Sequence, residues 1–250
     1  MFYFLTAVQF LTRFPVKRDL NPGPEDLAKS SLYFPVVGIL LGIVLWFVAK
    51  CLGTFIDSNL VVSAAMISLS MLMTGAFHED GLADTFDGIG GAFDPKSKLS
   101  IMKDSRIGTY GASALMLYIL LKASLYAELL DMGLFLPLIL SLSYGRYTSL
   151  VMIRALGYVS DDHSSKSKPV ASALEKSPFL KATLIQLATA AVCLPIEWLF
   201  PVLLLCILKL YGLKIFFEKQ IGGITGDVLG AVNVISELAI LILFTVISSL

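Results

Sequence analysis

Apolar runs of about 20 residues constrain this chain more than any other feature. About 20 consecutive apolar residues, wound as a helix, cross the hydrocarbon core of a bilayer. The sequence is 56% hydrophobic and 15% charged over 250 residues, whereas a soluble domain carries about 25% charged residues. The pattern therefore predicts an all-α fold, that of a polytopic helical membrane protein.

Seven transmembrane helices are expected after an apolar N-terminal segment. Charge follows that segment, MFYFLTAVQFLTRF, instead of preceding it, which is unlike a secretory signal peptide, so we expect it to be interfacial or re-entrant. No polar stretch long enough for a soluble domain separates the apolar runs, so residues 1–250 should form a single integral membrane domain. The expected spans are residues 32–52, 59–77, 109–130, 133–155, 179–195, 198–217 and 228–249.

Basic residues lie predominantly on one side of these predicted spans. Of the 19 lysines and arginines, 16 fall in the N-terminal segment and the long connections of one side, and Lys50 alone falls on the other. Lys122 and Arg146 lie inside spans. Because cytoplasmic loops carry the excess of Lys and Arg, we expect an inner-membrane protein with its N-terminus inside and its C-terminus outside.

An acidic window, TGAFHEDGLADTFDGIGG, closes the second predicted span and contains no lysine or arginine. Asp80, Asp84 and Asp87 recur at i, i+4 and i+7 and would share one helix face. Mg²⁺ takes hard oxygen ligands, often one or two carboxylates completed by substrate phosphates. A solvated acidic loop is the alternative. The expected Mg²⁺ ligands are Glu79, Asp80, Asp84 and Asp87, and His78 or one of the aspartates is the candidate base.

A second window, LSIMKDSRIGTYG, precedes the third span. The guanidinium fork of Arg106 suits phosphate oxygens, and a helix start with nearby glycines suits anions. The ordinary basic anchor of a span is the alternative. We expect Lys103, Asp104 and Arg106 to contact the substrate.

Polar residues also fall inside the later spans. An intramembrane arginine costs about 2.5 kcal/mol or more and usually faces a partner or a polar cavity, so Arg146 should hold a phosphate or pair with a carboxylate, unless it snorkels to the interface. Asp227, Asn233 and Glu237 are spaced for one face of the last span and are expected to bind substrate, with Asp227 best placed as a second metal ligand. Interhelical hydrogen bonding is the alternative for this group.

Several chemistries are excluded. The formal net charge of zero leaves no basic face for nucleic acid. No GxSxG, P-loop or HExxH motif occurs. The only histidines are His78 and His163, so catalysis by a Ser or Cys nucleophile has no support. The Asp161–Asp162 pair in the third cytoplasmic loop is expected to be solvated and without a chemical role.

These motifs together resemble one family, the cobalamin synthases or adenosylcobinamide-GDP ribazoletransferases. The resemblance covers most of the chain, although Val234 stands where the family often has glutamate. Glu237 matches the second acidic position of that motif. The matching segments are Leu5–Val16, Tyr33–Gly42, His78–Gly88, Ile101–Gly111 and Gly222–Ala231.

The resemblance implies a Mg²⁺-dependent transfer of adenosylcobinamide phosphate from adenosylcobinamide-GDP to α-ribazole or its 5′-phosphate, with release of GMP. Two other readings stay open. A CDP-alcohol-type membrane phosphotransferase would need an arginine shortly after an Asp-Gly pair, where this chain has Asp84. A cation-coupled transporter would place its charges near the bilayer midplane, often on repeated broken helices. The lipid bilayer is an expected partner, and a homo-oligomer is possible.

Overall fold

Helices form wherever the apolar runs predict a membrane span, so the all-α fold is confirmed. The computed structural model describes residues 1–16, 20–159 and 168–248, and the predicted loop residues Asp161, Asp162 and His163 lie outside these ranges. Among the described residues, β structure is limited to an isolated parallel bridge between Tyr158 and Ile224. The helices are α1 Phe2–Leu11, α2 Pro24–Ser30, η1 Ser31–Tyr33, α3 Phe34–Leu52, α4 Asn59–Thr74, α5 Phe77–Gly91, α6 Pro95–Met102, α7 Thr109–Asp131, α8 Leu136–Ala155, α9 Lys168–Ala173, α10 Lys176–Cys193, α11 Ile196–Ile221 and α12 Gly226–Ser248.

Five stretches are long and apolar enough to cross a membrane: Pro24–Leu52, which joins α2, η1 and α3, and helices α7, α8, α11 and α12. Helices α4 and α5 pass the same test only as a pair, bent by 92°. The described residues therefore hold five or six candidate spans, where the sequence predicts seven. The expected span 179–195 corresponds to α10, whose Lys181 and Gln186 make it less apolar than the other expected spans.

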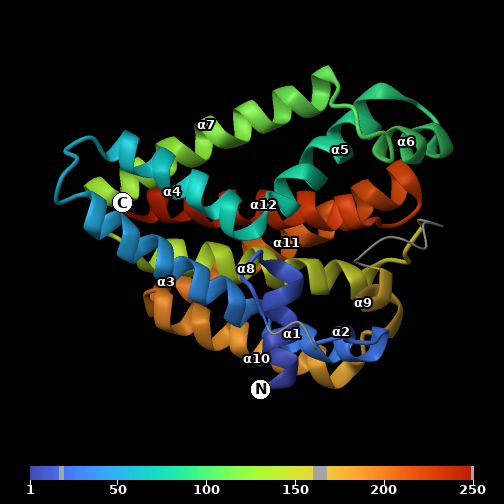
Figure 1. The fold of residues 1–250 in the computed structure, drawn as a ribbon, viewed down its shortest axis with the longest axis horizontal. Helices are drawn as coiled ribbons and strands as arrows, with labels where there is room; N and C mark the ends of the chain where they lie inside the picture. The colour runs from blue at the N-terminus through green and yellow to red at the C-terminus, as the bar shows by residue number, and fades with distance from the viewer. Residues whose placement is uncertain (17–19, 160–167, 249–250) are drawn as a thin grey trace.

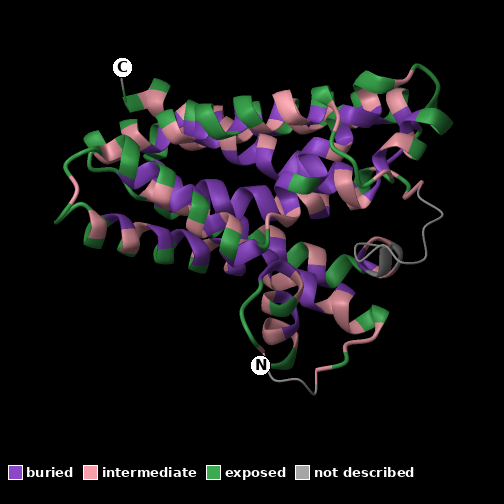
Figure 2. Ribbon diagram, turned by 45° about the horizontal axis from the view of Figure 1, so that its top comes forward, coloured by how far each residue is buried: buried purple, intermediate pink, exposed green. Residues whose placement is uncertain are grey.

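Helix α8 lies at the centre of the bundle. It packs against α3, α10 and α12, and 72% of its apolar window is buried, against 22% for α7 and 11% for α11. Figure 2 shows buried residues concentrated along the middle helices and exposed residues along the outer ones. The exposed faces of α7 and α11 are apolar, for example at Leu120 and Ile207, as suits helices surrounded by lipid tails.

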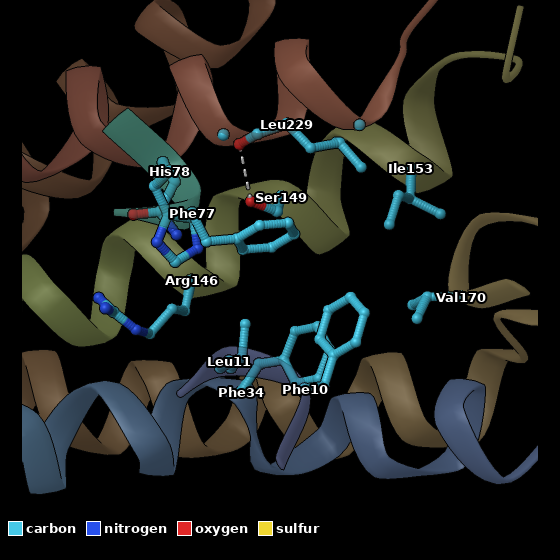
Figure 3. Close-up of a pocket in the computed structure, with 13 residues that line it drawn as sticks. Phe10, Leu11, Phe34, Phe77, His78, Arg146, Ser149, Ile153, Val170 and Leu229 are labelled. Carbon is cyan, nitrogen blue, oxygen red and sulfur yellow. Dashed lines mark hydrogen bonds between the residues drawn. The ribbon is translucent and has the colours of Figure 1, made fainter. Parts of the chain in front are cut away.

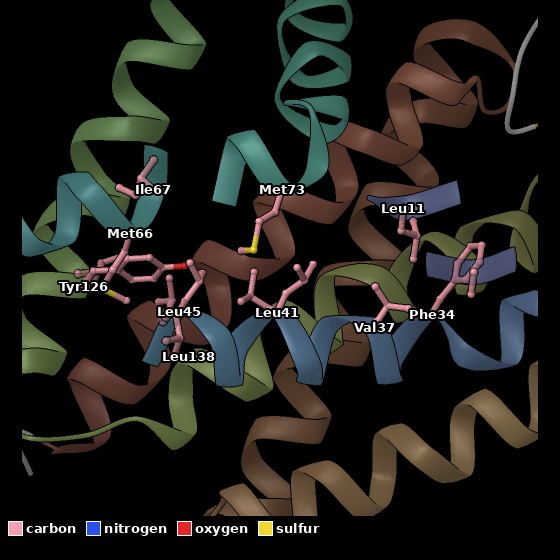
Figure 4. Close-up of a cluster of buried hydrophobic side chains, with 14 of the residues drawn as sticks. Leu11, Phe34, Val37, Leu41, Leu45, Met66, Ile67, Met73, Tyr126 and Leu138 are labelled. Carbon is pink, nitrogen blue, oxygen red and sulfur yellow. The ribbon is translucent and has the colours of Figure 1, made fainter. Parts of the chain in front are cut away.

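A cluster of buried apolar side chains joins α3 to its neighbours (Figure 4). Val37, Leu41 and Leu45 recur at intervals of four on α3 and are at most 2% exposed, so they form one buried stripe. Met66 of α4 and Leu138 of α8 belong to the same cluster. This stripe fixes α3 along the length of the bundle.

The connection between α4 and α5 turns the chain sharply. Gly75 ends α4 with φ 70° and Ala76 follows with φ 54°, both in the left-handed region, which glycine adopts without a steric penalty. The two residues produce the 92° bend. Helix α5 therefore leaves the direction of α4 and carries the acidic residues beyond the bend.

The two ends of the bundle differ. Helices α2, α6 and α9 lie at one end of the long axis, and the C-terminus and the α3–α4 connection lie at the other (Figure 1). The end that carries α6 also carries α5. Helix α5, which carries the acidic window, therefore runs toward the end of the molecule where the basic connection after α6 lies.

Candidate active site

The predicted acidic helix is confirmed as α5, and its three aspartates lie at graded depth. Asp80 is exposed, Asp84 is half-buried, and Asp87 is 7% exposed. The face they share therefore runs from the surface into the protein. Only the outer two aspartates are open to a ligand from outside.

Asp87 is engaged by the protein itself. Its Oδ2 accepts a hydrogen bond from the Gly108 N–H at 2.7 Å and its Oδ1 one from the Gly111 N–H at 2.8 Å. A carboxylate at this position satisfies the free N–H groups of the first turn of α7 and complements its dipole. The sequence predicts an anion-binding helix start in this window, and the start of α7 does bind an anion, which is the Asp87 carboxylate. The geometry of Asp87 therefore favours helix capping over metal binding.

Asp227 joins the outer aspartates from the other end of the sequence. An added Cβ on Gly81 would lie 2.6 Å from the Asp227 carbonyl oxygen, so α5 and the start of α12 approach closely only because residue 81 is glycine. Asp80 and Asp227 are among the charges that act on Asp84. We call Asp80, Asp84 and Asp227 the carboxylate cluster.

The start of α12 is held in place by a side-chain cap. Thr225 Oγ1 accepts a hydrogen bond from the Val228 N–H at 3.2 Å, which satisfies one of the free donors of the first helical turn. This cap fixes the backbone that carries Asp227 against Gly81. The conformation of the GGITGD segment therefore serves the carboxylate cluster.

The cluster suits a metal ion that is shared with a substrate. In the part of the chain that the structure describes, no group of three or more His, Cys, Asp or Glu side chains is placed so that it could hold a metal ion. Mg²⁺ commonly binds only one or two carboxylates, together with phosphate oxygens and water. The hard oxygens of Asp80, Asp84 and Asp227 fit that chemistry.

Arg146 pairs with a carboxylate deep in the bundle. Its Nη1 donates to Glu237 Oε1 at 2.9 Å, and Lys122 Nζ donates to Glu237 Oε2 at 2.7 Å. The three side chains are 1 to 3% exposed. Of the two expectations for Arg146, pairing with a carboxylate is confirmed. Lys122 is a partner that sequence reasoning missed, because its only signal was a charge inside a span.

Glu79 belongs to this buried network. Its side chain is buried, and the Tyr118 hydroxyl donates a hydrogen bond to Glu79 Oε1 at 3.4 Å. Lys122 in turn donates to the Tyr118 oxygen at 2.6 Å. Adjacent residues of a helix point in different directions, so Glu79 faces α7 while Asp80 faces the surface. The prediction that groups Glu79 with the metal ligands is not supported by this arrangement.

A pocket lies directly beneath the start of α5 (Figure 3). Phe10 of α1, Phe34 of α3 and Phe77 of α5 are among its walls, and the first two rings stack with centroids 5.5 Å apart. His78 and Arg146 also line it. Phe10 and Phe34 lie in family-like segments to which the sequence analysis assigned no function, and Phe77 lies in the acidic window. The tertiary fold brings the three together.

Asn233 lines the same pocket with its amide unsatisfied. The side chain is 1% exposed, and neither Oδ1 nor Nδ2 has a hydrogen-bond partner among the described residues. The Arg146 Nε is unsatisfied in the same sense. Burying an amide without a partner costs roughly 2–7 kcal/mol. The pocket has a volume of about 30 Å³, so a water molecule or one small polar group of a ligand that hydrogen-bonds to Asn233 would remove that cost. Asn233 is therefore a candidate substrate contact.

The predicted phosphate-binding residues of the α6–α7 connection form a local pair. Arg106 Nη2 donates to Asp104 Oδ2 at 2.6 Å and Arg106 Nε donates to Asp104 Oδ1 at 3.0 Å. The hydrogen bonds from Arg106 lower the pKa of Asp104 to about 2. Lys103 is exposed at the end of α6. Neither cation is brought against the carboxylate cluster by a contact that the structure shows.

Comparison with known proteins agrees with the motifs. Residues 3–245 match the family described as cobalamin-5-phosphate synthase. The adenosylcobinamide-GDP ribazoletransferase of Shewanella piezotolerans is 42% identical, and the alignment covers 98% of this chain and 95% of the relative. Proteins of the same name from Vibrio cholerae and Shewanella woodyi are 40% and 41% identical, covering 95% and 94% of this chain and 90% and 92% of theirs. No solved structure matches. The resemblance is confirmed, and the chain belongs to the cobalamin-5-phosphate synthase family.

Proposed function

We propose that this chain transfers adenosylcobinamide phosphate from adenosylcobinamide-GDP to α-ribazole or its 5′-phosphate and releases GMP. The names of the relatives give the reaction class. The observation that carries the assignment to a site is the carboxylate cluster, in which Asp80 and Asp84 of one family motif meet Asp227 of another across Gly81. Two separated motifs converging on one half-exposed surface support a shared chemical task.

The cluster would hold Mg²⁺ through Asp80, Asp84 and Asp227. A bound Mg²⁺ supplies charge neutralisation to the diphosphate and to the departing phosphate oxygen. Asp87 fixes the α7 start against α5 and so keeps the cluster on a rigid helix. Phosphoryl transfer depends mainly on such positioning and charge stabilisation.

In the proposed reaction the ribazole 5′-hydroxyl attacks the phosphorus nearer the cobinamide. A new P–O bond forms, the P–O bond to the GMP phosphate breaks, and GMP leaves with the bond electrons. The hydroxyl proton passes to His78 or to an aspartate of the cluster. These candidate bases lie in the first two turns of α5 or at the adjoining start of α12. The Asn233 amide orients the part of the substrate that enters the pocket, and Arg146 keeps the pocket floor polar through its bond to Glu237.

We propose further that the end of the bundle with α2, α6 and α9 faces the cytoplasm of a cell whose inner membrane holds the protein. That end carries the lysine- and arginine-rich connections, and such connections remain on the cytoplasmic side. Nucleotide substrates are available in the same compartment.

The experiment is an assay of the purified protein in phospholipid vesicles with adenosylcobinamide-GDP, α-ribazole and Mg²⁺, followed by GMP release. The wild-type protein should release GMP and stop when EDTA is added. Asp80→Asn and Asp84→Asn should each reduce the rate by about 100-fold or more, the scale of losing one charge-stabilising group. Full activity in both variants would refute the metal assignment. Activity with a lipid alcohol in place of α-ribazole would favour the CDP-alcohol class instead.

A further inference from the structure

A large apolar groove separates α10 and α11 on the side of the bundle away from the carboxylate cluster. It has a volume of about 260 Å³, whereas an engineered apolar cavity of about 150 Å³ already binds benzene. Helix α8 forms its floor with Tyr144 and Tyr147, α10 contributes Ala190, and α11 contributes Val202 and Cys206. We call this space the α10–α11 groove.

The polar groups around the groove are tied to one another. The hydroxyls of Tyr147 and Thr183 lie 3.1 Å apart, and Ser143 donates to Gln186 Oε1 at 2.7 Å. Tyr144 donates to the Cys206 carbonyl oxygen at 3.5 Å. The groove therefore presents a mainly hydrocarbon surface, which suits an apolar occupant.

The groove opens sideways, toward whatever surrounds the bundle. Leu187 of α10 and Ile207 of α11 line it and are 43% and 62% exposed. Only 11% of the apolar window of α11 is buried, so this helix faces lipid over most of its length. Lys209 of α11 links this helix to α12 and α8. Its Nζ donates to Ser236 Oγ at 2.6 Å and lies 4.6 Å from the Tyr144 ring centroid. A groove of this kind in a bilayer is open to acyl chains.

Basic residues follow the lining residues toward one end of the groove. Arg154 is one helical turn beyond Val151, Lys214 is one turn beyond Leu210, and Lys176 is two turns before Thr183. Residues at these spacings share a helix face. None of the ion pairs found in the described ranges involves these three cations. Their end of the groove is the end of the bundle that carries α9.

We propose that the α10–α11 groove binds one anionic phospholipid, with an acyl chain between the helices and the phosphate at Arg154, Lys176 and Lys214. The apolar lining and the lateral opening select the chain, and the three cations select the headgroup charge. Anionic lipids attract basic residues next to a membrane span in this way. Such a lipid would fill the space between α10 and α11 and so fix the position of α11 relative to α10.

The test is lipid retention by the purified full-length protein, measured by native mass spectrometry after addition of phosphatidylglycerol or phosphatidylcholine. The wild-type protein should retain one phosphatidylglycerol and less phosphatidylcholine. Ala190→Phe, which fills the groove, should lower the fraction of protein that retains lipid at least tenfold. Leu204→Phe, on the exposed face of α11, should leave that fraction unchanged. Combined Arg154→Gln, Lys176→Gln and Lys214→Gln should abolish the headgroup preference. Equal retention by Ala190→Phe and the wild-type protein would overturn the proposal.

A second measurement works even when Ala190→Phe fails to fold. Cys206 lines the groove, so in delipidated wild-type protein its alkylation by N-ethylmaleimide should slow several-fold when phosphatidylglycerol is added. Alkylation of Cys51, which is exposed and distant in the α3 sequence, serves as the internal control and should stay unchanged. An unchanged rate at Cys206 would contradict the proposal. Both readouts are independent of turnover, so they stand apart from the proposed transferase reaction.

Discussion

Glu237 Oε1 accepts a hydrogen bond from Arg146 Nη1 at 2.9 Å, and both side chains are almost completely buried. The other oxygen of Glu237 accepts a hydrogen bond from Lys122 Nζ, so one carboxylate joins α7, α8 and α12. Buried ion pairs of this kind are expensive to break, because the remaining charge loses its partner while it stays buried. The centre of the bundle is therefore held by charge as well as by apolar packing.

Replacing Glu237 by leucine should destabilise the protein strongly. Two buried cations would lose their acceptor, and breaking a buried pair typically costs about 3–5 kcal/mol. We expect a clear drop in the thermal unfolding midpoint, measured by intrinsic fluorescence in detergent. Glu197→Gln, at the exposed start of α11, is the matched control and should leave the midpoint unchanged. An unaltered midpoint in Glu237→Leu would show that the network contributes little.

Asp87→Asn should act on the α7 start and leave metal affinity intact. The amide keeps one acceptor oxygen, so one of the bonds to Gly108 and Gly111 is lost, and the loss of a helix cap costs about 1 kcal/mol. Faster hydrogen exchange in the first turn of α7 is the expected result. If Asp87 were instead a Mg²⁺ ligand, the Mg²⁺ concentration for half-maximal activity would rise many-fold.

Asp94→Ala provides the control for this capping effect. Asp94 caps α6 by accepting from the Ser97 N–H at 3.0 Å and is exposed, away from the buried contacts of Asp87. Exchange should increase at the start of α6 and stay unchanged at the start of α7.

Gly81→Ala should disrupt the carboxylate cluster. The new methyl group would lie 2.6 Å from the Asp227 carbonyl oxygen, so α12 must shift and Asp227 must leave its position beside Asp84. We expect a loss of activity of about 10-fold or more, since small displacements of positioning groups have effects on that scale. Gly212→Ala is the matched control, because nothing lies within 4 Å of its added Cβ, and there alanine should stabilise the helix slightly.

Asn233→Leu should separate stability from substrate binding. The amide has no partner among the described residues, so an apolar side chain of similar size should preserve or raise the unfolding temperature. The KM for the substrate that contacts Asn233 should rise, and measuring KM for both substrates identifies which one enters the pocket. A destabilised variant with unchanged KM values would show that Asn233 has a structural role.

Hydropathy and spacing predicted the helices well, because the bilayer and the helix period impose them locally. The face shared by Asp80 and Asp84 follows from the same periodicity. The contacts between distant segments were not predictable in this way: nothing near Lys122 in the sequence points to Glu237, and nothing near Asp87 indicates that it caps the helix that starts at Thr109. Of the seven expected spans, the one at α10 does not pass the length and hydropathy test, and the one at α4 passes only together with α5 across the 92° bend.

Helix α12 carries Asp227 at the carboxylate cluster, Asn233 at the pocket and Glu237 in the buried network. Because all three stand on one continuous helix, the distances between them follow from the helical rise of about 1.5 Å per residue. The six residue steps from Asp227 to Asn233 correspond to about 9 Å along the axis. Six steps of about 100° also turn the two side chains about 120° apart around the helix. A substrate that contacts both residues must therefore extend along α12 as well as part of the way around it.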